Sequence, residues 1–136
     1  MAEVWVELVD GPLAEADEPG DVAGAGARLC FAGVVRPTED DRPLDALMYE
    51  AYEPMTSRQL TALGEEMAAA HGLMAIRVEH STGRVAVGQT SFRLTVWSAH
   101  RKEGIAALDA FIDRMKAEVA LWKRPVFAES ATEVEA

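Results

Sequence analysis

Hydrophobic positions repeat with two different periods along this chain, and each period predicts its own kind of element. In several short stretches apolar residues alternate with polar ones, which is typical of a half-buried strand. In two longer stretches they recur every three or four residues, which is typical of an amphipathic helix. The expected strands cover residues 3–9, 27–35, 44–52, 74–80, 84–87 and 90–97, and the expected helices cover 56–72 and 103–119. This order predicts an α+β domain, with both helices packed on one face of a mostly antiparallel sheet.

Residues near the N-terminus carry further local predictions. The segment 10–26 is rich in Gly, Pro, Ala and acidic residues, so we expect a loop with a short helical turn near 12–16. Residues 27–35 are apolar on both faces except for Arg28, which is typical of a central strand buried on two sides. The single cysteine, Cys30, lies among these apolar residues and is expected to be a buried structural thiol.

The ends of the helices are also marked in the sequence. Thr56 and Gln59 can form a capping box at the start of the first helix, and Gly72 can end it. The residues from Ser81 to Gly83 read as a turn between two strands. Pro125 would stop any continuation of the second helix.

Composition limits the classes of function. The 136 residues fit one domain, and a formal charge of −10 opposes general binding to nucleic acid or to an anionic membrane. An anionic ligand would therefore need a local cationic pocket. A lone cysteine suits a reducing compartment, and no leader or membrane-spanning run is apparent, so we expect a soluble, cytoplasmic protein.

Cationic side chains follow two of the expected strands and are the best candidates for chemistry. Arg36 comes directly after the apolar strand 27–35, and His100 and Arg101 come after the strand 90–97. A side chain at the end of a buried strand can line a cleft while its backbone is held rigidly. These residues are therefore candidate ligands for phosphate or carboxylate groups.

A third basic cluster lies near the C-terminus. Lys116 and Lys123 are seven residues apart, so they would share a helix face if the helix lasted that far, and Arg124 is adjacent. They could equally be solvated residues favoured near a helix C-terminus. Because three clusters must converge in one small domain, we expect an anion-binding catalytic pocket. The glycine-rich segment 23–27 leads into a strand rather than a helix, so it does not read as a phosphate loop.

Five segments, in order, resemble successive signatures of the catalytic, large subunit of molybdopterin synthase. The similarity spans about residues 26–124. The segments are "GARLCFAGVVR" (26–36), "LMYEAYEPM" (47–55), "VEHSTGRVAVGQ" (78–89), "SAHR" (98–101) and "DRMKAEVALWKR" (113–124).

The resemblance implies a fold, an activity and partners. It implies one domain over residues 1–136 with an α/β hammerhead fold, a core at 26–124 and a short acidic tail at 125–136. It also implies a homodimer that carries a small ubiquitin-like sulfur-carrier subunit at each end, as a heterotetramer. The carrier's Gly-Gly thiocarboxylate would give sulfur twice to cyclic pyranopterin monophosphate and form the dithiolene of molybdopterin. This sulfurtransferase step needs neither a metal nor an organic cofactor.

The resemblance also assigns roles to residues. Lys116 matches the essential lysine of the family and Lys123 the second functional lysine, so both are expected to be catalytic and to contact substrate. The other expected substrate contacts are Val34, Val35, Arg36, His100, Arg101, Arg124 and Pro125.

Three departures from the family pattern leave alternatives open. The chain has Ser81 where the family usually has arginine, Pro125 where it often has an acidic residue, and no tryptophan after Trp122. One alternative is a non-catalytic dimeric paralogue that binds the carrier tail without turnover. Another is an unrelated domain whose strand-end cations bind a nucleotide. Retention of Lys116 and Lys123 favours the enzyme.

Overall fold

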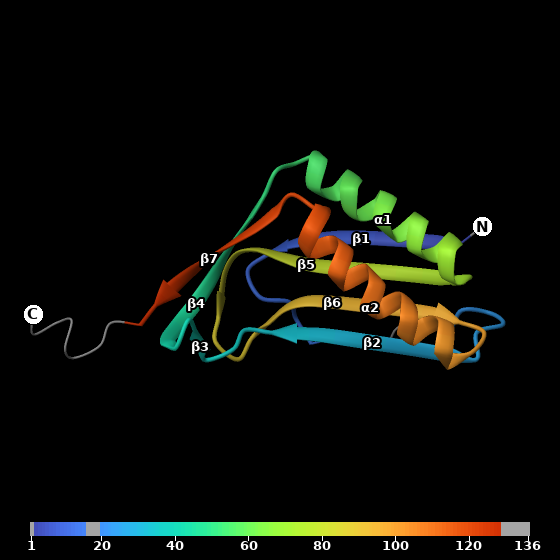
Figure 1. The fold of residues 1–136 in the computed structure, drawn as a ribbon, viewed down its shortest axis with the longest axis horizontal. Helices are drawn as coiled ribbons and strands as arrows, with labels where there is room; N and C mark the ends of the chain where they lie inside the picture. Colours follow the sequence, from blue (N-terminus) through green and yellow to red (C-terminus); the bar gives the residue numbers. More distant parts are fainter. Residues whose placement is uncertain (1, 16–19, 129–136) are drawn as a thin grey trace, which may run out of the picture.

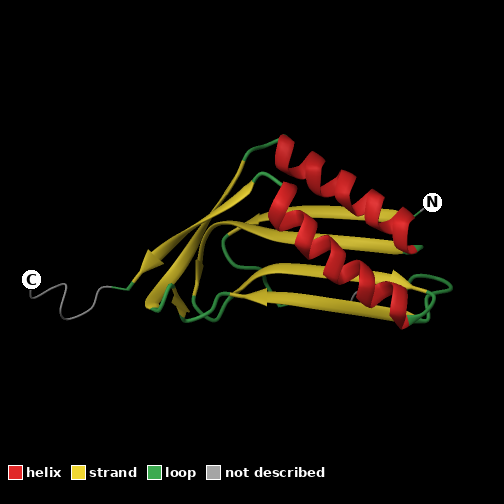
Figure 2. Cartoon of the chain, in the orientation of Figure 1, coloured by secondary structure: helices red, strands yellow, loops and turns green. Residues whose placement is uncertain are grey.

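The chain folds into two helices on one face of a seven-stranded sheet, in a computed structural model that describes residues 2–15 and 20–128 (Figures 1 and 2). No helix in these ranges is long and apolar enough to cross a lipid bilayer. The elements are β1 (Glu3–Asp10), β2 (Ala27–Val34), β3 (Thr38–Glu39), β4 (Arg42–Ala51), α1 (Met55–His71), β5 (Ala75–Ala86), β6 (Thr90–Ser98), α2 (Arg101–Glu118) and β7 (Leu121–Phe127).

The sheet has the strand order β2-β6-β5-β4-β3, with β1 beside β5 and β7 beside β4. The β1–β5 pair is parallel, and the other pairs of described strands are antiparallel. The α+β prediction with a mostly antiparallel sheet is therefore confirmed. The main core lies between the helices and β1, β5 and β6, and its fully buried side chains include Leu60, Ile76, Val78, Leu94, Val96 and Phe111.

Strand β5 is continuous where the sequence predicted a turn. Its first part pairs with β1 and β6, and from Gly83 onward it pairs with β4, so it carries the chain from one part of the sheet into the other. Gly83 has a φ of 75°, and a Cβ there would collide with the Asp10 carboxylate. The polar residues from Ser81 to Gly83 thus mark a bend within a strand, which turn-forming composition also favours.

Strand β2 lies at the edge of the sheet, so the prediction of a central strand was wrong. Within the described residues it pairs with β6 alone. Phe31 and Val34 are 41% and 52% exposed, and Cys30 is exposed rather than buried. A strand that is apolar on both faces can be covered by another molecule as well as by its own chain, and sequence periodicity does not distinguish these cases.

The predicted capping box at α1 does not form, because the helix already begins at Met55, and Thr56 and Gln59 bond instead to Ala120, just before β7. The Thr56 hydroxyl donates to the Ala120 carbonyl at 2.6 Å, and the Gln59 side-chain oxygen accepts from the Ala120 amide at 2.7 Å. Helix α1 has Pro54 at its N-cap and ends at Gly72, as predicted. The two bonds to Ala120 anchor the junction between α2 and β7.

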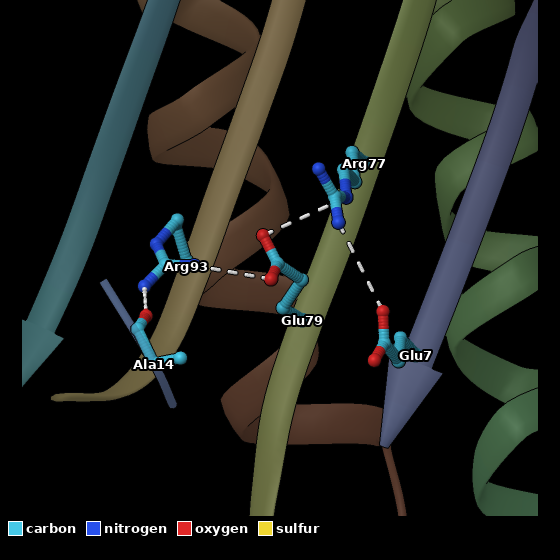
Figure 3. Close-up of polar contacts among 5 residues, drawn as sticks. All are labelled: Glu7, Ala14, Arg77, Glu79 and Arg93. Carbon is cyan, nitrogen blue, oxygen red and sulfur yellow. Dashed lines mark hydrogen bonds and ion pairs between the residues drawn. The ribbon is translucent and has the colours of Figure 1, made fainter. Parts of the chain in front are cut away.

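A buried polar network lies on the sheet face away from the helices (Figure 3). Arg93 donates to the Glu79 carboxylate at 3.1 Å and to the Ala14 carbonyl, and both charged residues are 8% exposed. Arg77 continues the network, 3.7 Å from Glu79 and 3.9 Å from Glu7. Because each buried charge has a partner, this face of the sheet can be covered without a large desolvation penalty.

Residues 11–15, which contribute the Ala14 carbonyl to this network, do not form the helical turn expected near residues 12–16. Within residues 11–15 the backbone forms a bend and an irregular stretch. Gly11 donates to the Thr82 carbonyl at 2.7 Å and Leu13 to the Thr90 carbonyl at 2.9 Å. Residues 16–19 lie outside the described part of the chain.

Candidate functional site

A pocket of about 410 Å³ opens where the end of β2, the last turns of α2 and the start of β7 meet the bend of β5. Most of its walls are apolar, and its polar groups come from two lysines, a histidine and two hydroxyl-bearing residues. The lining residues are Phe31, Gly33, Val34, Tyr49, His80, Ser91, Phe92, Ile112, Met115, Lys116, Leu121 and Lys123.

The two candidate lysines both line this pocket, although they do not share a helix. Helix α2 ends at Glu118, so Lys116 lies in its last turn and Lys123 lies on β7. The chain reverses at Val119 and Ala120, and this reversal brings the lysines to one cavity. The helix does not last long enough for the two lysines to share one of its faces, but both line this pocket. The Lys123 ammonium lies 3.4 Å from the Glu39 carboxylate.

A cluster of aromatic and polar side chains forms another wall. The His80 ring packs edge-on to Tyr49 at a centroid distance of 5.0 Å, and at a tilt against Phe92 at 5.5 Å. The Tyr49 hydroxyl lies 3.0 Å from the Ser91 hydroxyl. These contacts hold the imidazole in a fixed orientation beside the two lysines.

His80 is uncharged at neutral pH. It is 5% exposed, and burial lowers its pKa from 6.5 to about 4, although a hydrogen bond to the Ser81 carbonyl acts in the opposite direction. Its Nδ1 lies 2.8 Å from that carbonyl oxygen. Because a carbonyl only accepts, Nδ1 carries the ring proton in the neutral form and Nε2 keeps a lone pair.

Four further residues that were expected to contact substrate do not line the pocket, namely Val35, Arg36, Arg124 and Pro125. Val35 is buried in a second apolar cluster, and its amide and carbonyl bond to the turn at Gly88 and Gln89. Arg36 is exposed just beyond the end of β2, and Arg124 is exposed on β7. Pro125 is opposite Leu47 on β4. Val34, which was also expected to contact substrate, does line the cavity.

His100 and Arg101 lie at the opposite end of α2 from Lys116. His100 is the N-cap residue, its amide donates to the Glu103 carboxylate at 3.3 Å, and its side chain is 85% exposed. With a rise of 1.5 Å per residue, the helix separates Arg101 from Lys116 by about 22 Å. Within one chain, His100 and Arg101 therefore do not join the lysine pocket.

Sequence reasoning missed Tyr49, His80, Ser91 and Glu39. His80 ends the apolar alternation of residues 74–80, so the strand-end criterion that selected Arg36 and His100 would also have selected it. Glu39 had no comparable signal, because the two-residue strand β3 that positions it is too short to show a period.

The arrangement suits an anionic ligand with an extended, partly apolar body. Two ammonium groups can attract and orient a carboxylate, thiocarboxylate or phosphate. The apolar walls exclude water and strengthen those interactions. Among the described residues, no group of three or more His, Cys, Asp and Glu side chains is placed to hold a metal ion.

The fold and the pocket together define an α+β protein with a cavity lined by two lysines where α2 meets β7. The family model described as "MoaE protein" matches residues 10–118, and the chain belongs to this family. A molybdopterin synthase catalytic subunit from Aspergillus oryzae is 33% identical over 132 residues, which are 96% of this chain and 74% of that protein. A protein of the same name from Coccidioides immitis is 31% identical over 126 residues, covering 91% of this chain and 64% of its own length. The chain thus spans less than two thirds of the latter relative.

Solved structures share the fold over nearly the whole chain. A molybdopterin synthase from Staphylococcus aureus superposes with a TM-score of 0.78 at 26% identity, covering 91% of this chain and 92% of that chain. A complex of subunits 1 and 2 of molybdopterin-converting factor from Helicobacter pylori gives a TM-score of 0.70 at 22% identity, covering 93% and 91%. This second similarity supports the fold alone.

Proposed function

We propose that this chain is the catalytic subunit of a molybdopterin synthase. It would transfer sulfur from the C-terminal thiocarboxylate of a small carrier protein to cyclic pyranopterin monophosphate, forming the dithiolene of molybdopterin. The observation that carries the proposal is the meeting of Lys116 and Lys123 in one largely apolar pocket of a MoaE-family chain. Its cytoplasmic location stays a prediction.

The pocket supplies groups suited to this chemistry. The thiocarboxylate sulfur attacks an electrophilic carbon of the pterin substrate, so a carbon–sulfur bond forms while a carbon–oxygen bond of the same carbon breaks, and that oxygen leaves protonated, as water or on the opened phosphate ester. Water then cleaves the acyl–sulfur bond, leaving the sulfur on the substrate and a carboxylate on the carrier. Lys116 acts as acid/base or as a transient covalent partner at the tail's carbonyl, and Lys123 stabilises the oxyanion and the departing carboxylate. Repeating the sequence with a second carrier gives the two sulfurs of the dithiolene.

A glycine-ended tail is the carrier segment that fits such a cavity. The walls formed by Phe31, Phe92 and Met115 leave a cavity of about 410 Å³, and two residues without side chains need the least room to extend into it. The Helicobacter pylori relative is described as a complex of subunits 1 and 2, and a two-subunit assembly is proposed for this chain as well.

A homodimer would complete the site. Among the described residues β2 pairs with β6 alone, so the outer edge of this strand, which carries the exposed Phe31 and Val34, is open to another strand. Antiparallel pairing of β2 with β2 of a second copy would put the start of one strand beside the end of the other. The start of β2 lies near Ser98, so the second copy's His100 and Arg101 would approach the end that carries Val34. They could then bind the substrate's phosphate in trans, with Arg36 nearby.

Reconstitution tests the proposal against both alternatives. The purified chain is mixed with thiocarboxylated carrier and cyclic pyranopterin monophosphate, and dithiolene product is measured. Product formation supports the synthase. Carrier binding without product would instead support the non-catalytic paralogue, and the absence of both would leave an unrelated anion-binding domain.

A further inference from the structure

His80 is a buried titratable residue that faces the pocket and has no role in the chemistry proposed above. Its ring is fixed by Tyr49 on one side and Phe92 on the other, and its Nδ1 is engaged by the Ser81 carbonyl. Such fixation from three directions is more than packing alone requires. It presents the remaining ring nitrogen in one defined direction.

That nitrogen, Nε2, is an acceptor that is not sealed inside the protein. Within residues 2–15 and 20–128, no group donates a hydrogen bond to it. In these ranges, the fully buried side-chain nitrogen and oxygen atoms that lack a hydrogen-bond partner are Ser81 Oγ and Trp97 Nε1. Nε2 of His80 also lacks a partner but is not among them, so it is not fully buried. His80 itself lines the pocket together with Lys116 and Lys123.

The pocket therefore has two kinds of group that can recognise a ligand. The lysines bring positive charge, and the imidazole brings a neutral acceptor in an apolar wall formed with Phe92. A ligand that complements both carries an anionic group and, deeper along its body, an N–H donor. A ligand without the N–H would leave Nε2 desolvated and unpaired, which costs binding energy.

We propose that His80 is a ligand-contacting residue of this pocket, whose Nε2 accepts a hydrogen bond from an N–H group of the bound molecule. This inference rests on the proposed function, which offers two sources of that N–H: an amide of the carrier's Gly-Gly tail, or a ring nitrogen of the pyranopterin. His80 then selects ligands by a donor group, as the lysines select them by charge.

Binding measurements on variants test the contact. His80→Phe keeps an aromatic ring of similar size but removes the acceptor, and His80→Gln returns an acceptor near the Nε2 position. His71→Phe, at the end of α1 and outside the pocket, is the matched control. The probes are a carrier with an unmodified Gly-Gly carboxylate end and cyclic pyranopterin monophosphate, each titrated by calorimetry.

His80→Phe is expected to weaken one of the two probes by about tenfold, His80→Gln to recover most of that loss, and His71→Phe to change nothing. A carrier whose last tail amide is N-methylated identifies the source. If the tail supplies the N–H, the N-methylated carrier should bind the unaltered protein about tenfold more weakly than the normal carrier does. It should bind the His80→Phe variant as tightly as the normal carrier does. If the pyranopterin supplies it, N-methylation has the same effect on both proteins.

A second readout does not depend on any variant folding. In the unaltered, ¹⁵N-histidine-labelled protein, the Nε2 resonance of His80 should shift on adding the ligand that donates to it. No shift with either probe, or affinities of His80→Phe within twofold of the unaltered protein for both, overturns the inference. If the unaltered chain makes product while His80→Phe binds normally, this inference alone fails. If the unaltered chain binds neither probe, the proposed function fails and the inference falls with it.

Discussion

The ammonium of Lys123 on β7 lies 3.4 Å from the carboxylate of Glu39 on β3. The Lys123 side chain is 52% exposed and that of Glu39 is 22% exposed, so the pair lies at the rim of the pocket. A carboxylate of the protein thus occupies the place where an anionic ligand would meet Lys123. The short hairpin that holds Glu39 continues through Asp40 and Asp41, which have φ values of 53° and 61°.

Replacing Glu39 by glutamine should tighten the binding of an anionic ligand. Removing one negative charge beside Lys123 raises the positive potential at the rim, and an exposed pair of this kind contributes up to about 1 kcal/mol. We expect the Kd for cyclic pyranopterin monophosphate to fall by about two- to fivefold at low salt, and less at high salt. Calorimetric titration measures this change.

Asp41→Asn is the matched control for that substitution. It removes the same charge from the same hairpin, and asparagine tolerates the left-handed backbone that Asp41 adopts. We expect a smaller change in Kd than for Glu39→Gln. Equal changes in the two variants would show a general charge effect, and weaker binding by Glu39→Gln would contradict the competition between Glu39 and the ligand.

Mixing two inactive variants tests the homodimer with a shared site. Arg101→Ala and Lys116→Ala should each abolish most activity, because each removes a different half of the proposed site. In a mixed dimer, one of the two sites recovers both residues. After equal mixing and exchange of subunits, about a quarter of the unaltered activity should return. Activity that stays at the level of the separate variants would show that Arg101 and Lys116 do not act across two chains.

The buried His80 should make stability depend on pH in a defined range. Its pKa is lowered from 6.5 to about 4, chiefly by burial, so the unfolded chain takes up a proton before the folded chain does. The stabilisation from the neutral ring is present above pH 6.5, falls as the pH drops from 6.5 to 4, and is lost below about 4. Over this range the free energy of unfolding should lose about 3 kcal/mol from this group.

Urea denaturation of the unaltered protein and of His80→Phe at several pH values isolates this contribution. The difference between their unfolding free energies should change between pH 6.5 and 4 and be constant above pH 7. A constant difference across the whole range would show that the His80 pKa is not lowered in the folded chain.

The buried pair of Arg93 and Glu79 predicts a large loss of stability when one partner is removed. Arg93→Met keeps much of the side-chain volume but leaves Glu79 with Arg77 as its nearest cation, at 3.7 Å. We expect the free energy of unfolding to fall by about 3 kcal/mol, measured by urea denaturation. Asp21→Asn, which removes a fully exposed partner of Arg28, should change it by less than about 1 kcal/mol. Similar losses in both variants would contradict the assigned burial of the network.

The hydrophobic periodicity predicted the helices and the class of fold because the residues that face one common core must be apolar, and this requirement sets the period in each element. Leu60 and Phe111 face that core from α1 and α2, and both sit in the helical repeats seen in the sequence. Strand β2 shows what hydrophobic periodicity cannot predict. Apolar residues on both of its faces indicate burial by something, but they do not say whether the covering surface belongs to the same chain.

Only part of the candidate site could be predicted, because contacts between residues far apart in sequence shape it. Lys116 and Lys123 were selected as neighbours on a helix, yet a chain reversal at Ala120 brings them together. At that reversal, Ala120 accepts a hydrogen bond from Thr56 and donates one to Gln59, and these partners lie about sixty residues away in sequence, so no local pattern encodes the contacts. His80 could have been selected because it ends an expected strand, but the contacts with Tyr49 and Phe92 that fix its ring come from two other strands and could not be predicted.

The proposed catalytic role of Lys116 can be tested in a single-turnover assay. Lys116→Ala and the control Lys102→Ala, an exposed lysine in the first turn of the same helix, are each mixed with thiocarboxylated carrier and cyclic pyranopterin monophosphate. We predict that Lys116→Ala binds the carrier normally but forms dithiolene at least about a hundredfold more slowly, while Lys102→Ala matches the unaltered chain. Full product formation by Lys116→Ala with normal carrier binding would contradict the account.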